Sequence, residues 1–82
     1  MINEAKVLEI VGNVLQLDAN LISIDSSSEN TDEWDSLAHL SILVELDRYL
    51  DGKASKINEL ATATSVRVIM EILTKHDLKS NG

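Results

Sequence analysis

The segment around Ser36 combines a hydroxyl group, several carboxylates and the expected start of a helix. Asp35 is suited to the N-cap position, which leaves Ser36 in the first helical turn, where backbone N–H groups lack intrahelical partners. A phosphoryl group on the Ser36 oxygen would be stabilised by these donors and by the positive end of the helix dipole. The nearby acids Asp32, Glu33 and Asp35 favour a singly charged phosphodiester over a dianionic monoester. A serine in this place can also be a plain capping residue, so the local chemistry permits modification without requiring it.

Helical spacing of apolar residues predicts the elements that position this serine. A first helix is expected from about Asn3 to Gln16, with Asn3 as its N-cap. Its apolar face comprises Val7, Ile10, Val11, Val14 and Leu15. A long polar loop is expected to follow from Leu17 to Trp34, with Leu21, Ile22 and Ile24 anchoring it to the core. Loops of this length in a small domain are uncommon and are often functional.

The second expected helix begins at the serine and runs for about fifteen residues. Its apolar stripe is predicted to comprise Leu37, Leu40, Leu43, Val44, Leu46 and Leu50. The helix should end at Asp51-Gly52-Lys53, because Gly52 can adopt the left-handed conformation of a C′ residue.

The last part of the chain predicts one short and one longer helix. Ser55 to Leu60 can form the short one, burying Ile57 and Leu60. Thr64 or Ser65 then caps a helix that extends through His76, where a protonated imidazole would suit the helix C-terminus. The apolar stripe of this last helix is expected to comprise Val66, Ile69, Met70 and Leu73.

The predicted fold class is therefore all-α: a small bundle of three main helices plus one short helix, with a long loop between helices 1 and 2. The chain of 82 residues should form a single domain over 1–82, with a frayed tail at about 78–82. It contains no cysteine, proline or phenylalanine, so apolar packing between helices must stabilise it.

Acidic charge is concentrated around the candidate serine. The net charge is −7, and the stretch from Asp18 to Asp51 holds nine acids and one base, Arg48, which amounts to −8. Such a field repels nucleic acid and anionic lipid and attracts partners with basic patches. No apolar run approaches the roughly 20 residues that a membrane span needs. Residues 1–9 lack the features of a signal peptide, so a cytoplasmic protein is expected. We also expect the chain to be a monomer.

The residue types and their spacing do not indicate an enzyme or a metal-binding protein. The two histidines are far apart in the chain, cysteine is absent and no metal-ligand spacing occurs. A calcium loop over 25–36 fails because Asn30 occupies the position that needs glycine and Ser36 the position that needs a bidentate glutamate. We therefore expect no catalytic residues and no metal site in this chain.

The run Trp34-Asp35-Ser36-Leu37-Ala38-His39-Leu40 resembles the attachment motif of the acyl carrier proteins. The resemblance extends over nearly the whole chain, through its length, acidity, long first loop and expected helices. It implies that a phosphopantetheinyl transferase moves 4′-phosphopantetheine from coenzyme A to Ser36, with Asp35 and Leu37 as part of the attachment site. The thiol of the arm would then hold acyl or aminoacyl groups as thioesters between partner enzymes.

The resemblance also implies a docking surface on the second helix and its flanking loop. The expected docking residues are Glu33, Trp34, His39, Leu40, Val44, Glu45 and Asp47. Trp34 is predicted mainly as a loop anchor, with direct partner contact as the alternative. His39 is predicted as a polar group at the surface or near the cap, which could alternatively bind the phosphate or a partner. Leu37 and Val44 fit either the core or the border of the docking face.

The sequence departs from carriers of bacterial fatty-acid synthesis after the Asp-Ser-Leu tripeptide. The next turns hold Ala38, His39 and Ser41, where that type has further acids. This difference favours a freestanding carrier of a specialised pathway over the housekeeping carrier of type II fatty-acid synthesis. From another class, an unmodified acidic helical interaction module also agrees with composition and periodicity.

Overall fold

The chain folds into three α-helices and three short 3₁₀ segments in the computed structural model, which describes residues 3–76. The order is α1 (Glu4–Leu15), η1 (Ala19–Leu21), α2 (Ser36–Tyr49), η2 (Ala54–Lys56), η3 (Asn58–Thr62) and α3 (Val66–Lys75). No β-strand occurs within residues 3–76, so the predicted all-α class is confirmed there. The frayed tail predicted at 78–82 lies outside the described residues.

Each α-helix begins at a side-chain cap. Asn3 Oδ1 accepts a hydrogen bond from the Ala5 N–H at 2.9 Å. Asp35 Oδ1 accepts from the Ala38 N–H at 2.8 Å, and Ser65 Oγ accepts from the Val68 N–H at 3.1 Å. These bonds satisfy N–H groups that the helices cannot satisfy themselves. The predicted caps Asn3 and Asp35 are confirmed, and Ser65 rather than Thr64 begins the last helix.

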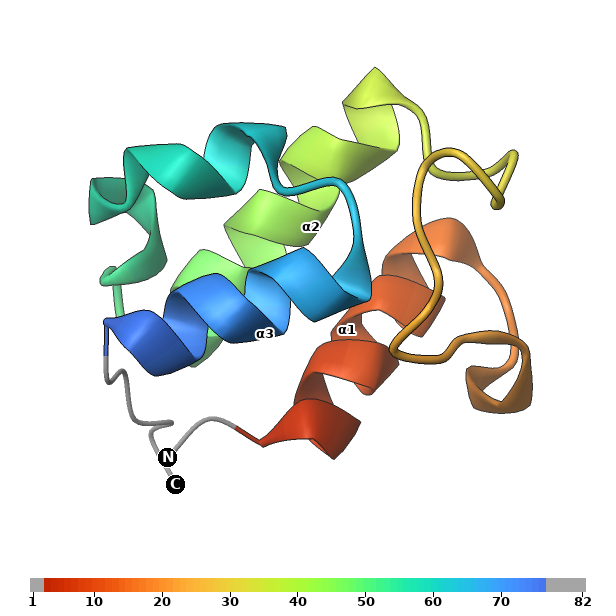
Figure 1. Cartoon of the computed structure of the whole chain (residues 1–82), viewed down its shortest axis with the longest axis horizontal. Helices are drawn as coiled ribbons and strands as arrows, with labels where there is room; N and C mark the ends of the chain where they lie inside the picture. Colours follow the sequence, from red (N-terminus) through yellow and green to blue (C-terminus); the bar gives the residue numbers. More distant parts are fainter. Residues whose placement is uncertain (1–2, 77–82) are drawn as a thin grey trace.

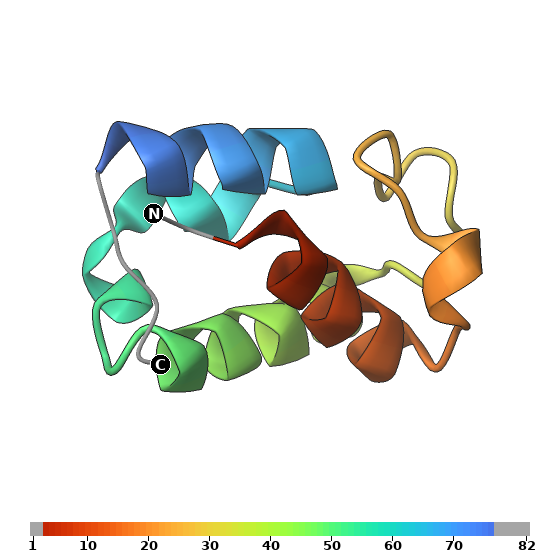
Figure 2. The ribbon, with the colours of Figure 1, turned by 90° about the horizontal axis from the view of Figure 1, so that it is seen from below.

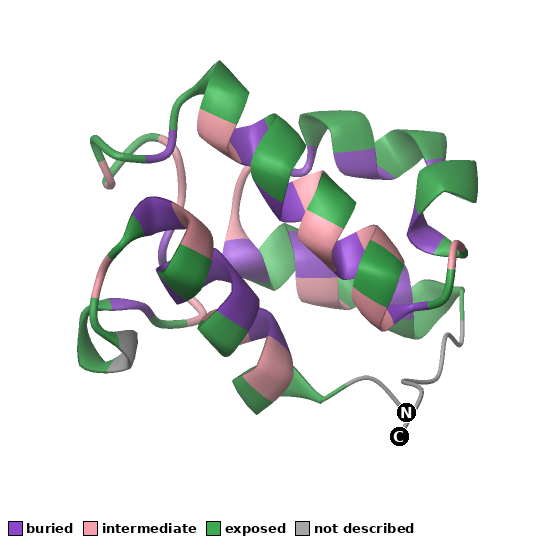
Figure 3. Cartoon of the chain, turned by 180° about the vertical axis from the view of Figure 1, so that it is seen from behind, coloured by how far each residue is buried: buried purple, intermediate pink, exposed green. Residues whose placement is uncertain are grey.

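Helix α1 packs against both α2 and α3, while η3 fills the space between α2 and α3 on the other side. In Figures 1 and 2, α2 and α3 lie in different layers, and the long loop is at the same end as the first turn of α2. Buried side chains line the inward sides of these elements (Figure 3). The largest that are fully buried are Ile42, Leu46, Leu50, Leu60, Ile69, Leu73, Val7, Val11 and Val66.

The long loop is fixed to the start of α3. The Ser28 N–H donates to the Thr64 carbonyl at 2.9 Å, and the Val66 N–H donates to the Ser26 carbonyl at 3.0 Å. Ile22 is buried and Ile24 is half-buried, as predicted. The prediction for Leu21 was wrong, because its side chain is 64% exposed. Ile22 enters the core directly after η1, so the adjacent Leu21 points to solvent.

The chain turns sharply between α2 and η2. Asp51 and Gly52 both have positive φ angles, 59° and 84°, and the Gly52 N–H donates to the Asp47 carbonyl at 2.8 Å. Gly52 has the predicted left-handed conformation, but it does not occupy the predicted C′ position. The C-cap is Leu50, so Asp51 is the C′ residue, and its N–H donates to the Arg48 carbonyl at 3.3 Å. The predicted short helix consists of two 3₁₀ segments, η2 and η3, and Ile57 and Leu60 are buried as expected. No helix of the described chain has the length and apolar content needed to cross a membrane.

Candidate functional site

Ser36 is the first residue of α2, and its side chain is exposed. The Asp35 carboxylate accepts a hydrogen bond from the Ala38 N–H, and the His39 N–H donates to the Asp35 carbonyl at 2.9 Å. Within residues 3–76, the N–H groups of Ser36 and Leu37 have no hydrogen-bond partner. An exposed hydroxyl next to two unused N–H donors and the positive helix end fits a phosphodiester on Ser36.

A pocket of about 510 Å³ lies beside this serine. Its walls come from the loop, from the first two turns of α2 and from the segment around η3. Trp34, His39 and Ala61 contribute to the lining together with Ser36 itself. A group attached to the Ser36 oxygen would therefore lie next to a partly apolar recess.

Trp34 and His39 are both buried below this pocket, with 2% and 5% of their surfaces exposed. The Trp34 Nε1–H donates to His39 Nδ1 at 3.1 Å, and His39 Nε2 lies 2.9 Å from the Leu60 carbonyl oxygen. The two rings are stacked, with centroids 6.1 Å apart and planes inclined by 23°. Trp34 is thus the loop anchor that the sequence predicts. The placement of His39 at the surface was wrong, because the ring lies in the core with both nitrogens paired.

Helical spacing could have indicated the burial of His39. It lies three residues before Ile42 and seven before Leu46, which places it on the same face as these two fully buried residues. The predicted stripe correctly included the buried Leu46 and Leu50, but it omitted Ile42 and contained three residues that are exposed. Most positions in this half of α2 are apolar, so periodicity alone does not select the buried face.

Three large apolar side chains of α2 are exposed instead of buried. Leu37 is 74% exposed, Leu40 59% and Val44 56%. Their spacing of three, four and seven residues puts them on one face of the helix. Leu40, which was predicted both on the apolar stripe and among the docking residues, lies at the surface, and of the two alternatives for Leu37 and Val44 the structure favours the surface.

The acidic residues expected at the docking surface differ in their availability. Glu33 is exposed in the loop. Glu45 is half-buried and pairs with Arg48 at 3.5 Å. Asp47 Oδ1 accepts a hydrogen bond from the Ser55 N–H at 2.8 Å, so this carboxylate supports the turn after α2. A partner would therefore meet Glu33 and Glu45 before Asp47.

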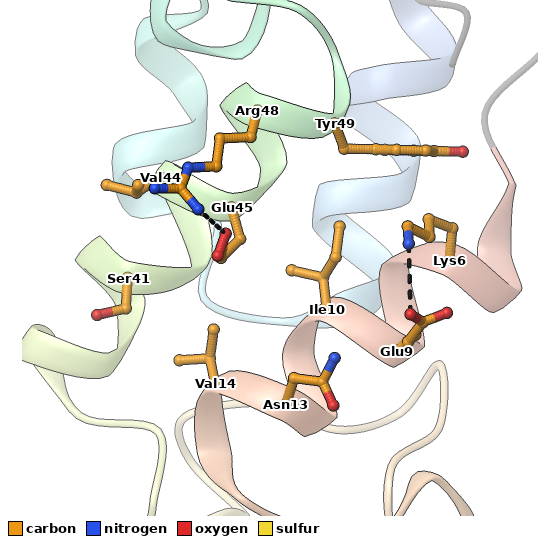
Figure 4. A pocket seen from close by; sticks show the side chains of 10 residues that line it. All are labelled: Lys6, Glu9, Ile10, Asn13, Val14, Ser41, Val44, Glu45, Arg48 and Tyr49. Atoms are coloured by element: carbon orange, nitrogen blue, oxygen red, sulfur yellow. Dashed lines mark hydrogen bonds and ion pairs between the residues drawn. The ribbon is translucent and has the colours of Figure 1, made fainter. Parts of the chain in front are cut away.

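A groove of about 760 Å³ lies between the outer sides of α1 and α2 (Figure 4). Ile10 and Val14 of α1 and Val44 of α2 are among its lining residues, and Tyr49 lies near one end. The ion pair of Lys6 with Glu9, 3.3 Å apart, stands on one side, and the pair of Glu45 with Arg48 on the other. The exposed face of α2 is thus continuous with this groove through Val44.

A small polar cluster joins η3 to the C-terminal end of α3. Glu59 of η3 lies 3.0 Å from His76 Nε2 and 3.3 Å from Lys75 Nζ. Hydrogen bonds from His76 and then from Lys75 lower the pKa of the Glu59 carboxylate below its ordinary value. Across residues 3–76, no group of three or more His, Cys, Asp or Glu side chains is arranged to hold a metal ion.

Comparisons with models of protein families, with characterised proteins and with solved structures found no match to this chain. The fold is a small α-helical domain, and the site is an exposed serine at the start of α2 beside a pocket and an exposed apolar helix face.

Proposed function

We propose that this chain is an acyl carrier protein in which Ser36 receives 4′-phosphopantetheine. The observation that carries the proposal is the exposed Ser36 hydroxyl at the N-terminus of α2, with Asp35 as cap and two unused N–H groups. The bundle of three main helices and one short element, which corresponds here to the two 3₁₀ segments η2 and η3, belongs to the same proposal. We assign the carrier to the cytoplasm and, from the residues that follow Leu37, to a specialised pathway rather than to fatty-acid synthesis.

Ser36 would act as the nucleophile that receives the arm. Its Oγ attacks the β-phosphorus of coenzyme A while bound to a transferase, which takes up the hydroxyl proton. The new Oγ–P bond replaces the P–O bond to adenosine 3′,5′-bisphosphate, which leaves. The N–H groups of Ser36 and Leu37 then face a singly charged phosphodiester. Once attached, the arm supplies a thiol that holds acyl or aminoacyl groups as thioesters.

The exposed face of α2 is the proposed docking surface for partner enzymes. Leu37, Leu40 and Val44 offer apolar contact area, and Glu33 and Glu45 stand beside it. The acidic charge would steer basic partners and accelerate association, while the small apolar area keeps binding reversible. Trp34 and His39 lie behind this surface and are not part of the contact.

The test is the intact mass of the purified chain before and after incubation with coenzyme A and a broad-specificity phosphopantetheinyl transferase. We expect a gain of one phosphopantetheinyl group in the wild type and in Ser41→Ala, a control at another exposed serine of α2. Ser36→Ala should gain nothing and stay folded, because Asp35 still caps the helix. Equal modification of Ser36→Ala would refute the assignment.

An unmodified wild-type chain would favour the other class, an acidic interaction module without an arm. The exposed stripe of Leu37, Leu40 and Val44 would serve such a module equally well. A transferase shown to modify a known carrier in the same reaction mixture makes a negative result meaningful.

A further inference from the structure

His39 contacts both residues that precede Ser36. Its Nδ1 accepts the hydrogen bond from the Trp34 indole at 3.1 Å, and its backbone N–H donates to the Asp35 carbonyl at 2.9 Å. On the other side, its Nε2 reaches the carbonyl of Leu60, a residue of η3 that is only 1% exposed. One side chain therefore connects the loop, the start of α2 and a fixed point in the core.

These partners define the protonation of the ring. The indole nitrogen can only donate, so Nδ1 must be the bare nitrogen of the imidazole. A carbonyl oxygen can only accept, so Nε2 must carry the proton and donate to Leu60. The ring has no ion-pair partner within residues 3–76. The charged groups of the surrounding elements have other partners. Asp35 caps α2, Glu59 pairs with Lys75 and His76, and Lys6 pairs with Glu9. Asp32 and Glu33 are exposed.

We infer that His39, as the Nε2–H tautomer, is a positioning residue for Ser36: it ties Trp34 to Leu60 and so holds the attachment turn in place. The inference rests on the proposed carrier function. An apolar side chain could fill the same space, but it would leave the Trp34 indole buried without a partner. The two hydrogen bonds of the ring therefore fix the orientation of the turn between Trp34 and His39, which holds the Ser36 nucleophile that a transferase must meet in a defined direction.

Two amide substitutions separate the two bonds. In His39→Gln the amide nitrogen can approach the place of Nε2 and donate to Leu60, but the acceptor for Trp34 is lost. In His39→Asn the amide oxygen can approach the place of Nδ1 and accept from Trp34, but the donor to Leu60 is lost. Since Trp34 adjoins the site, His39→Gln should have the larger effect on Ser36.

The experiment measures transferase kinetics with each variant as the protein substrate. We expect kcat to fall about tenfold for His39→Gln, and less for His39→Asn, because Ser36 is misaligned. KM should change little, because the docking face formed by Leu40 and Val44 is untouched. Ile69→Val, a core variant in α3, and His76→Asn, at the other histidine, should both keep the wild-type kcat.

Failure of the inference is distinct from failure of the proposed function. A wild-type chain that no competent transferase modifies overturns the carrier role and the positioning role together. A modified wild type with an unchanged kcat in His39→Gln, or an equal loss in Ile69→Val, overturns the positioning role alone. If the His39 variants do not fold, nitrogen-15 NMR of the wild type decides: a proton on Nδ1 instead of Nε2 overturns the inference. The same spectra hold one indole signal, because Trp34 is the only tryptophan.

Discussion

Helices α2 and α3 use their apolar residues in different ways. Helix α3 buries Val66, Ile69, Ile72 and Leu73, and its most exposed large apolar residue is Val68 at 40%. Helix α2 leaves Leu37, Leu40 and Val44 more than half exposed and buries a histidine. Isolated exposed apolar residues are ordinary, but three on one face of one helix, beside Ser36, are what the proposed docking surface requires. Helix α3 therefore serves mainly the core, whereas α2 buries Ile42 and Leu46 in the core and also carries an exposed apolar face.

The largest effect on stability is expected from a cavity beside α3. Leu73→Ala should lower the free energy of unfolding by about 3 kcal/mol, because Leu73 is fully buried and its removal leaves a void. Urea denaturation followed by circular dichroism measures the loss. The attachment rate of the fraction that remains folded should stay at the wild-type value. A loss within about 0.5 kcal/mol, the range of surface substitutions, would contradict the assignment of α3 to the core.

The next largest effect is expected at the cap of α2. Asp35→Ala should cost about 1 kcal/mol of stability, because the Ala38 N–H loses the 2.8 Å bond that caps the helix. Modification of Ser36 should also become slower. Asp35→Asn keeps an oxygen acceptor and should restore most of the stability. Unchanged modification kinetics in Asp35→Ala would show that the transferase does not depend on this cap.

Substitutions on the exposed face of α2 should change the stability little and should weaken binding to the transferase clearly. Leu40→Ala combined with Val44→Ala should change the free energy of unfolding by less than about 0.5 kcal/mol, because both side chains are already largely in solvent. KM for the transferase should rise severalfold, since contact area is lost before the chemical step. Val68→Ala is the matched control on α3. An equal rise in KM for Val68→Ala would remove the distinction between the two helices.

The sequence predicted the elements well because their signals are local. Caps at Asn3 and Asp35, apolar spacing in α1 and α3, and Gly52 at the end of α2 each depend on a few neighbouring residues. The short third element was placed correctly, although a single helix was expected and two 3₁₀ segments occur.

The errors concern which face of an element meets the core. Leu21 was predicted to anchor the loop to the core, yet tertiary packing leaves it exposed. His39 is polar by type, yet Trp34 and the Leu60 carbonyl supply partners that only the folded chain brings together. Leu60 is 21 residues away, so no local pattern could predict that bond. The position of Ser36 at the start of α2 and its cap Asp35 followed from the sequence, but the pocket beside it and the buried ring pair behind it did not.

The smallest expected effect lies at the end of α3, away from the contact surface. Hydrogen bonds from His76 and Lys75 lower the pKa of Glu59, so the folded state binds this proton less readily than the unfolded chain. Its contribution to stability is present above the pKa of the unfolded chain, about 4.3, and is lost as the pH falls through the folded-state value. Because the cluster is half exposed, solvent screens it and the contribution is small. Urea midpoints between pH 6 and 3 should therefore fall slightly less in Glu59→Gln than in the wild type, and the two chains should converge at the acidic end. Identical midpoints over the whole range would mean that this cluster adds nothing to the stabilising role of α3.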